Sequence, residues 1–297
     1  MPRTKPTHNN PEIGQPLADH LAVPTRIGEE ISITGKWVPA EPGGRFRRGD
    51  DTESLRREWE DIHAAAAADS GVLTTEINHA VGEDAVLVHH VFENGDAVAD
   101  YFGRTATKHL PALNEIARPD LQLVRGAAIP QAALDAIAAT GVDAAISEHL
   151  FGFVKSDDLP DPATAINVTA KWTVKPDEAN ATIEELTHWW QMVGTDAYEL
   201  ETGMIRFETF RVIGEDALVI HEVFDDTAEL KFHLTKGTAD RYKKQIDEIA
   251  APERYYFRGP VSWTIRTYSK FMHLPATYSS RGSNAVAPGG SMSDGRA

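Results

Sequence analysis

Apolar and polar residues alternate in several short stretches of the chain, and the longer stretches between them have helical spacing. ISITGKWV, residues 31–38, alternates as a strand with one buried face does. A helical run follows from about Asp51 to Ala68, and residues 71–92 predict two strands around the turn Gly82-Glu83-Asp84. A second helical run stops at Pro119, and LQLVRGAAI predicts a last strand. This order is typical of a ferredoxin-like βαββαβ unit with both helices on one face of its sheet.

The pattern then occurs a second time, with much of the same sequence. GEDAVLVHHVF corresponds to GEDALVIHEVF, and ISITGKWV corresponds to INVTAKWT. His89 matches His221 in this comparison, and Arg125 matches Arg258. Such internal similarity indicates a duplicated structural unit. The predicted parts of the chain are a flexible N-terminal arm at 1–29, a first ferredoxin-like unit at 30–126, a helical linker at 127–165, a second ferredoxin-like unit at 166–270 and a disordered tail at 271–297.

One sheet face of each predicted unit has no helix to cover it. An exposed apolar sheet face is unstable in water, so another part of the protein has to pack against it. Two units in one chain can cover each other by packing sheet to sheet. The sequence therefore predicts an α+β protein in which two ferredoxin-like βαββαβ units form an intrachain α+β barrel, with the helices outside.

Composition and charge narrow the choice of partners. The 297 residues carry a formal net charge of −16, which repels nucleic-acid phosphates and anionic lipid headgroups. We therefore expect neither nucleic acid nor a membrane as a partner, and the sequence shows no apolar run of membrane-spanning length. The lack of cysteine excludes thiol nucleophiles, disulfides and thiolate metal sites. We expect a cytoplasmic protein, and the sequence leaves its assembly into a homo-oligomer open.

Alternate strand positions share a face, so the strand pattern also places the polar side chains. In the first strand of the first unit, the apolar residues on one face are expected to meet the helices. Thr34 and Lys36 share the other face, and Thr169 and Lys171 repeat this arrangement in the second unit. These four side chains are therefore predicted to point into the barrel or towards its mouth.

The matched histidines His89 and His221 are also predicted to face the barrel, whereas their neighbours His90 and Glu222 point the other way. Because neighbouring strand residues lie on opposite faces, His89 and His90 cannot readily share an ion, and we predict no metal site. A site formed by His89, His221 and a carboxylate is the less favoured alternative. A histidine between two strands is also more often a hydrogen-bonded core residue than a catalyst.

Three kinds of stretch point to a known family. They are HHVF and HEVF at the ends of matched strands, FGRTATKHLPAL and HLTKGTADRY in the helices that follow, and VRGAAIPQAALDAI after the fourth strand. In these stretches the chain resembles the antibiotic biosynthesis monooxygenase-like members of the dimeric α+β barrel superfamily. The resemblance covers roughly residues 30 to 270, once in each half. It implies a cofactor-independent monooxygenase that oxidises an electron-rich aromatic substrate, such as a quinol, an anthrone or a polyketide-like compound, with molecular oxygen in the barrel cavity.

The resemblance implies a pocket with a base and with groups that bind a developing oxyanion. The candidate catalytic residues are His221, His89, Glu208 and Glu76, and the candidate substrate-binding residues are Lys36, Lys171, Arg206, Tyr242, His109 and Glu222. We prefer His221 to His89, because its half contains more polar groups that can orient a base. The competing interpretation of Glu76 and Glu208 is that they form structural ion pairs with lysines or arginines.

The halves differ at matched positions, which predicts that their pockets are not equivalent. Glu222 stands where the first half has His90, and Tyr242 stands where the first half has His109, a position at which family members frequently carry histidine. Two other functions stay open: a non-catalytic small-molecule-binding barrel, and a haem-binding or haem-degrading protein. Haem would need an axial ligand, for which the candidates are His89, His221, His109 and His233.

Overall fold

The computed structural model of the protein describes residues 21, 28–40, 48–66, 71–156, 161, 163–178 and 181–279. Most of the predicted N-terminal arm lies outside the described residues, as do residues 280–297 of the predicted tail. Leu21, within the predicted arm, is buried in the hydrophobic core of the second unit.

The first unit has the predicted order of elements. These are β1 (Ile31–Pro39), α1 (Arg48–Ala66), β2 (Val72–His79), β3 (Val86–Phe92), α2 (Gly95–Asp100), a π-helix (Tyr101–Ala106), α3 (Thr107–Ile116), β4 (Ala117–Pro119) and β5 (Gln122–Gly126). The strand order β2-β3-β1-β5 is that of a ferredoxin-like sheet, and β4 pairs with one end of β1. In β1, Ile33 and Trp37 belong to the core beneath the helices, whereas Thr34 bonds across to His89 on the other face.

The second unit has the same arrangement. Its elements are β7 (Ile166–Val174), α5 (Ile183–Leu200), β8 (Met204–Val212), β9 (Ala217–Phe224), α6 (Thr227–Thr235), α7 (Thr238–Ile249) and β10 (Ala250–Arg258), in the strand order β8-β9-β7-β10. The first helix after the third strand begins in the same way in both units. Asn94 accepts a bond from Ala97 N, and Asp226 accepts bonds from Ala228 N and Glu229 N, as N-cap residues do.

The segment between the units contains a strand as well as the expected helix. Residues 127–165 were predicted to be helical, but they form α4 (Gln131–Ala138) and the long strand β6 (Ala144–Val154). β6 is parallel to β5 and antiparallel to β8, so it joins the two predicted sheets into one. At Gly152 a Cβ would lie 2.3 Å from the Phe207 carbonyl oxygen, so glycine permits the close contact between β6 and β8.

The joined sheet curls until its two edges meet. After α8 (Trp263–Phe271), the strand β11 (Ala276–Tyr278) pairs with β10. Val81 N donates to Tyr278 O at 2.8 Å, and Ala80 bridges to Ser279, which connects β11 to the end of β2. The predicted disordered tail is therefore wrong for residues 271–279, because Tyr278 stacks on Phe257 with ring centroids 4.9 Å apart and is buried.

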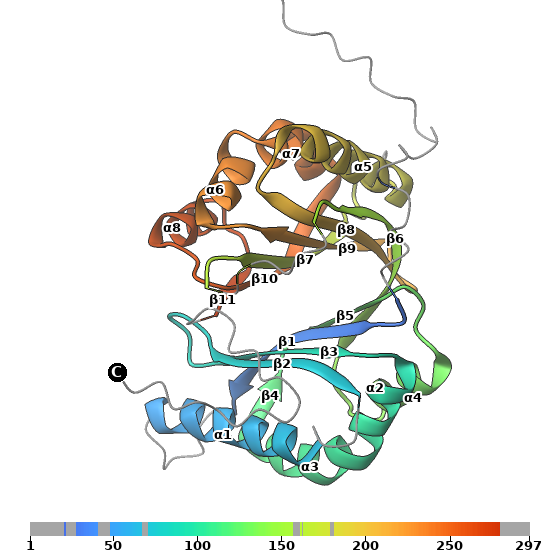
Figure 1. Cartoon of the computed structure of the whole chain (residues 1–297), viewed down its shortest axis with the longest axis vertical. Helices are drawn as coiled ribbons and strands as arrows, with labels where there is room; N and C mark the ends of the chain where they lie inside the picture. The colour runs from blue at the N-terminus through green and yellow to red at the C-terminus, as the bar shows by residue number, and fades with distance from the viewer. Residues whose placement is uncertain are drawn as a thin grey trace, which may run out of the picture.

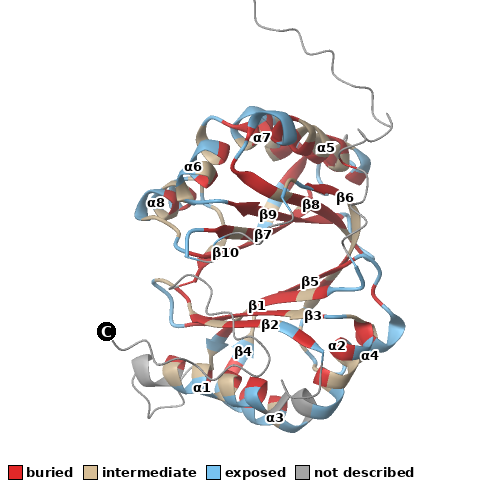
Figure 2. Ribbon diagram, viewed as in Figure 1, coloured by how far each residue is buried: buried red, intermediate tan, exposed pale blue. Residues whose placement is uncertain are grey.

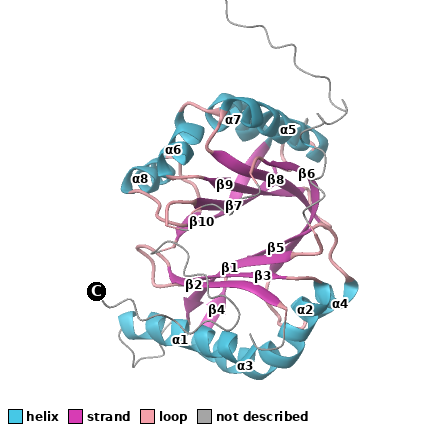
Figure 3. Ribbon diagram, viewed as in Figure 1, coloured by secondary structure: helices cyan, strands magenta, loops and turns pink. Residues whose placement is uncertain are grey.

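The result is the predicted α+β barrel. Figure 1 shows the strands of the two units facing each other, joined through β5 and β6. The helices cover the two outer sides, as the colouring by secondary structure in Figure 3 makes clear. Figure 2 shows buried residues along the strands and on the inward faces of the helices. Among the described residues, no helix is long and apolar enough to cross a membrane.

Three hydrophobic clusters follow from this architecture. One lies between the sheet and helices of the first unit, and a second lies in the same place in the second unit. The third lies inside the barrel and consists of Leu87, Leu121, Leu123, Ala145, Phe210, Val212, Ala217, Val219 and Tyr256. The long strands therefore have an inner face towards the barrel and an outer face towards the helices, and a functional site can lie on either.

Candidate functional site

The two matched histidines lie on the inner face, inside the barrel. His89 Nδ1 is 2.8 Å from Thr34 Oγ1, and His221 Nδ1 is 3.1 Å from Thr169 Oγ1. Burial lowers the pKa of both imidazoles well below 6.5, and neighbouring arginines, Arg125 among them, lower it further. Both rings are therefore neutral, and each is tied to a threonine on the adjacent strand.

Glu76 and Glu208 are also inside the barrel, where arginines pair with them. Arg258 Nη1 donates to Glu76 Oε1 at 2.7 Å, and both side chains are buried. Arg206 Nη2 donates to Glu208 Oε1 at 2.8 Å, and its Nε is 2.7 Å from Oε2. The structure thus contains the ion pairs that the competing interpretation of these carboxylates expected.

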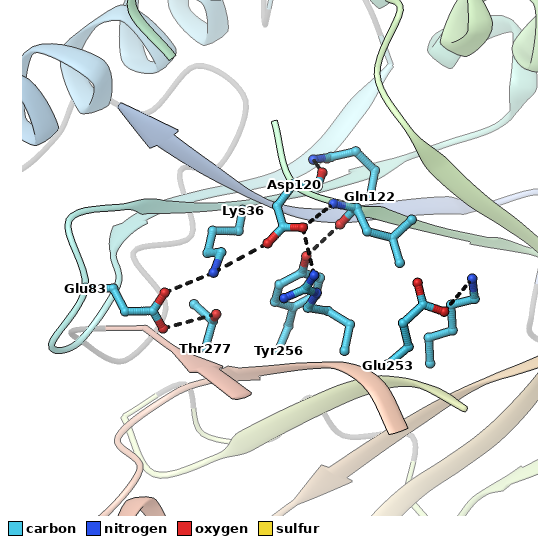
Figure 4. Close-up of polar contacts among 10 residues, drawn as sticks. Lys36, Glu83, Asp120, Gln122, Glu253, Tyr256 and Thr277 are labelled. Carbon is cyan, nitrogen blue, oxygen red and sulfur yellow. Dashed lines mark hydrogen bonds and ion pairs between the residues drawn. The ribbon is translucent and has the colours of Figure 1, made fainter. Parts of the chain in front are cut away.

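The two lysines lie at the mouth of the barrel, each between two carboxylates. Lys36 Nζ is 2.9 Å from Glu83 and 3.4 Å from Asp120. Figure 4 shows that this chain of contacts continues into the second unit, because Glu83 also contacts Thr277 and Asp120 contacts an arginine of β10. Lys171 is held in the same way by Glu215 and Glu253, at 2.6 and 2.9 Å. Two carboxylates thus compensate each ammonium, and the contacts of Asp120 with Arg254 and of Glu83 with Thr277 connect the two sides of the mouth.

His109 and Tyr242 lie between helices. Tyr242 OH donates to Asp196 Oδ2 at 2.7 Å, which joins α7 to α5. Burial and the Asp196 carboxylate raise the pKa of Tyr242 to about 12. His109 Nδ1 is 3.9 Å from Glu58 on α1. Neither residue lines the cavities described next.

A cavity of about 60 Å³ lies in the second unit, between the outer face of the sheet and the helices α5 to α8. Its lining is mainly aromatic and aliphatic, and it includes Glu222 from β9 and His233 from α6. The full lining is Val168, Trp172, Trp190, Glu222, Leu230, His233, Leu234, Ala239, Lys243, Ile246, Tyr255, Phe257, Tyr268, Met272 and Leu274. Of the residues proposed from sequence, Glu222 lines this cavity, while its neighbour His221 points into the barrel.

Glu222 belongs to a buried group of three ionisable side chains. His233 Nδ1 is 2.8 Å from Glu201 Oε2, and His233 Nε2 is 3.3 Å from Glu222 Oε1. All three residues are buried. Burial opposes a charge on His233, but the two carboxylates outweigh it and raise its pKa to about 10. His233 is therefore an imidazolium at neutral pH, held between two carboxylates.

The backbone around α6 and α7 positions this group. Glu201 is the C-cap residue of α5, and its Oε1 accepts a bond from Thr238 N, at the start of α7, at 2.6 Å. At Gly237, a Cβ would lie 2.5 Å from Glu201 Oε1 and 2.7 Å from His233 Cα, so a larger residue would disturb the contact. Burial works to raise the Glu201 pKa, yet the His233 hydrogen bond holds it below its usual value.

A smaller cavity, of about 30 Å³, occupies the same place in the first unit. His90 lines it from the position that matches Glu222. Its Nδ1 is 3.0 Å from Thr75 Oγ1, and its ring lies 5.8 Å from Trp59 and 5.2 Å from Tyr101. Burial lowers the pKa of His90 to about 3, so the ring is neutral. The lining of the first cavity therefore carries no charge, whereas Glu222 and His233 line the second, so the two cavities differ as the sequence predicted.

Sequence reasoning missed His233 as the partner of Glu222, although a signal was present. Tyr101 and His233 lie at the same separation along the chain as His89 and His221. The change from His90 to Glu222 is therefore accompanied by a change from Tyr101 to His233, two side chains that touch in each unit. Two residues that change together between the units, as these do, are expected to be in contact, and this signal in the sequence could have identified His233 as the partner of Glu222.

The structure also bears on ligands for a metal or haem. Among the described residues, no group of three or more histidines, aspartates and glutamates is placed to hold a metal ion. Of the histidines considered as axial haem ligands, His233 has both ring nitrogens against carboxylates. His89 and His221 each have one ring nitrogen at a threonine hydroxyl inside the barrel.

No protein-family model and no curated protein sequence matches the chain. Solved structures with a similar fold include a candidate monooxygenase from Fusobacterium nucleatum, 13% identical over 76% of this chain and 90% of its own, with a TM-score of 0.48. A candidate chlorite dismutase is 17% identical over 75% of this chain and 90% of its own, with a TM-score of 0.44. SnoaB from Streptomyces nogalater, a cofactor-independent oxygenase, is 13% identical over 34% of this chain and 96% of its own, with a TM-score of 0.29. These are distant similarities of fold, and they assign no activity to this chain.

Proposed function

We propose that the chain is a monooxygenase that oxidises an electron-rich aromatic substrate, of the quinol or anthrone type, without a metal or flavin. We place the reaction in the cavity of the second unit. One observation carries this proposal: the Glu222 carboxylate lines a mainly aromatic cavity beside the charged His233. An ionised carboxylate in such surroundings is suited to take a proton from a weakly acidic aromatic substrate.

In the proposed reaction, an O–H or C–H proton of the substrate passes to a Glu222 oxygen. The resulting anion is stabilised by delocalisation over the rings and by the nearby His233 imidazolium, which Glu201 keeps protonated. The anion then reduces molecular oxygen. For an anthrone, one oxygen atom becomes a carbonyl of the product and the other leaves as water, so that a CH₂ group and O₂ give C=O and H₂O. For a naphthohydroquinone, one oxygen atom enters as a ring hydroxyl and the other leaves as water, so that the quinol and O₂ give a hydroxyquinone and H₂O.

The aromatic lining supplies the binding surface. Trp172 and Trp190 meet edge to face with ring centroids 5.7 Å apart. The Trp190 indole nitrogen has no hydrogen-bond partner among the described residues, so its N–H can donate to a substrate oxygen. Rings of this kind favour a planar aromatic substrate through stacking and edge contacts.

The proposal moves the base from His221 to its neighbour Glu222. His221 lies on the inner face of β9, bonded to Thr169 inside the barrel and away from this cavity. Glu222 lies on the outer face of the same strand, at the cavity. The matched residues of the two units support an origin by tandem duplication, after which the second unit kept the chemistry.

The cavity has to enlarge for such a substrate. A volume of about 60 Å³ holds roughly two water molecules. Tyr268, Met272 and Leu274 form the part of the lining contributed by α8 and the residues after it, and Tyr268 OH donates to Leu234 O at 2.9 Å. We propose that this cover moves outwards to admit the substrate.

The test is oxygen uptake with anthrone and with a naphthohydroquinone. We expect the wild-type protein to accelerate uptake above the rate in buffer, and Glu222→Gln to lower the rate by about 10²- to 10⁴-fold, the usual contribution of a general base. His90→Gln, the matched change in the first unit, should leave the rate within about twofold. Binding of these compounds without oxygen uptake would instead indicate a non-catalytic binding protein. An unchanged rate in folded Glu222→Gln would exclude Glu222 as the base.

A further inference from the structure

The barrel interior contains two matched pairs of arginine and glutamate, and the pairs differ. Each pair crosses from the last strand of one unit to the second strand of the other. Arg258 and Glu76 are 2.7 Å apart and hydrogen-bonded. Arg125 and Glu208 occupy the matched positions, but their closest atoms are 3.8 Å apart. That distance is too long for a hydrogen bond.

Arg206 explains the difference. Its Nη2 donates to Glu208 Oε1 at 2.8 Å and its Nε lies 2.7 Å from Oε2, so the Glu208 carboxylate pairs with Arg206 and not with Arg125. The first unit has Thr74 at the matched position, so nothing competes with Arg258 for Glu76. The replacement of a threonine by an arginine has thus added one cation beside Glu208, and the exposed Glu30 also stabilises this cation from the protein surface.

Arg125 is consequently a buried cation with an incomplete set of partners. Its side chain is 5% exposed, and its Nε has no hydrogen-bond partner among the described residues. Its guanidinium carbon lies 5.4 Å from the centre of the Phe210 ring, a contact that compensates only part of the cost of burying a charge. Burial lowers the pKa of Arg125 to about 9, so the group is still charged at neutral pH.

The balance of charge in this region is positive. Arg125, Arg206 and Arg258 face Glu76 and Glu208, which leaves one positive charge among these five residues. His89 and His221 add none, because both are neutral. One monoanion would neutralise the region, whereas a dianion would leave an uncompensated negative charge.

We propose that Arg125 binds a small monocarboxylate inside the barrel, beside β6, where this strand joins β5 to β8. The flat fork of a guanidinium matches the two oxygens of a carboxylate and can donate to both. His149 on β6 contacts the same Phe210 ring, at 5.2 Å between centroids, and both of its ring nitrogens are buried without a partner among the described residues. It provides a second donor for the anion. This site lies on the inner face of the sheet, separate from the cavity at Glu222.

The test is calorimetric titration of the full chain with formate and acetate, at constant ionic strength in a zwitterionic buffer. We expect saturable binding at one site, and its loss in Arg125→Met. Arg206→Thr restores the residue type of the first unit, so Glu208 becomes free to pair with Arg125. In this variant the Glu208 carboxylate competes with formate for Arg125. Formate should therefore bind at least about tenfold more weakly than to the wild type, although Arg125 is still present, because one charge-assisted hydrogen bond to the anion is lost.

Melting temperature without formate provides a second readout. Arg125→Met should melt at or above the temperature of the wild type, because it removes an uncompensated buried charge and Glu208 keeps Arg206. Lys36→Met, which removes a cation at the mouth, should bind formate as the wild type does. The proposal is overturned if the wild type shows no saturable binding of formate. It is also overturned if either Arg125→Met or Arg206→Thr binds formate with the same affinity as the wild type.

Discussion

The two units present the same pair of indoles to their cavities and then differ in the side chains beside them. Trp37 and Trp59 meet edge to face at 5.0 Å in the first unit, as Trp172 and Trp190 do at 5.7 Å in the second. Next to the first pair, His90 touches Tyr101, and next to the second, Glu222 pairs with His233.

The two cavities differ in charge as well as in volume. In the first unit, burial favours the neutral form of the histidine, and no carboxylate among the described residues offsets it. In the second unit, two carboxylates reverse this balance, and the buried histidine is charged. A fold that is used twice can therefore hold one cavity suited to proton transfer and one that is not.

The largest effect is expected from breaking the ion pairs of the second unit. His233→Phe leaves Glu201 and Glu222 buried without their partner, which should lower the free energy of unfolding by about 3–5 kcal/mol. Tyr101→Phe, the matched change in the first unit, should cost little, because the Tyr101 hydroxyl is buried without a hydrogen-bond partner among the described residues. Urea denaturation of both variants measures the two changes in the free energy of unfolding. Equal losses of stability would contradict the proposed difference in charge between the two cavities.

Alkaline pH should weaken the second unit more gradually. The pKa of His233 is raised from 6.5 to about 10 in the folded protein, so its contribution to stability is complete below pH 6.5 and is lost as pH rises through about 10. The loss for one group is at most about 1.4 kcal/mol per pH unit. Denaturation between pH 7 and pH 10 should therefore show a steeper decline for the wild type than for His233→Phe. Parallel curves would show that His233 is not charged in the fold.

Acid pH should act through the buried neutral histidines of both units, and the part due to His90 in the first unit is expected to be smaller. The pKa of His90 is lowered from 6.5 to about 3, so its contribution is present above pH 6.5 and is lost as pH falls towards 3. His90→Phe removes the group that must take up a proton on unfolding, and its stability should fall less between pH 6.5 and pH 5 than that of the wild type. An identical fall in both proteins would mean that His90 is not held neutral.

The sequence predicted most of the fold because local pattern and repetition agreed. Alternation in ISITGKWV placed Thr34 on the inner face, and the matched strand pattern placed His89 beside it, where the structure has both. The strands β6 and β11 were missed. AAISEHLFGFV follows a helix in a segment without clear alternation, and β11 has only three residues, so both depend on the strands they pair with.

The candidate site was predicted only in part, for a related reason. Periodicity assigns a strand residue to a face, and it separated His221 from Glu222 correctly. It does not show which helical residue meets that face. His233 reaches Glu222 because α6 packs against β9, and such packing between elements is a tertiary effect. The role of His221, His89 and the barrel carboxylates in catalysis stays a prediction, which His221→Asn would test beside Glu222→Gln.

The central claim is that the second cavity holds a charged histidine and the first a neutral one. Nitrogen-15 NMR of the histidine side chains, assigned with His233→Phe and His90→Phe, measures this directly, because imidazolium and neutral imidazole nitrogens have distinct shifts. At pH 8 we expect both ring nitrogens of His233 to be protonated, and at pH 5 we expect His90 to carry one proton. A neutral His233 at pH 8, or a charged His90 at pH 5, would contradict the account.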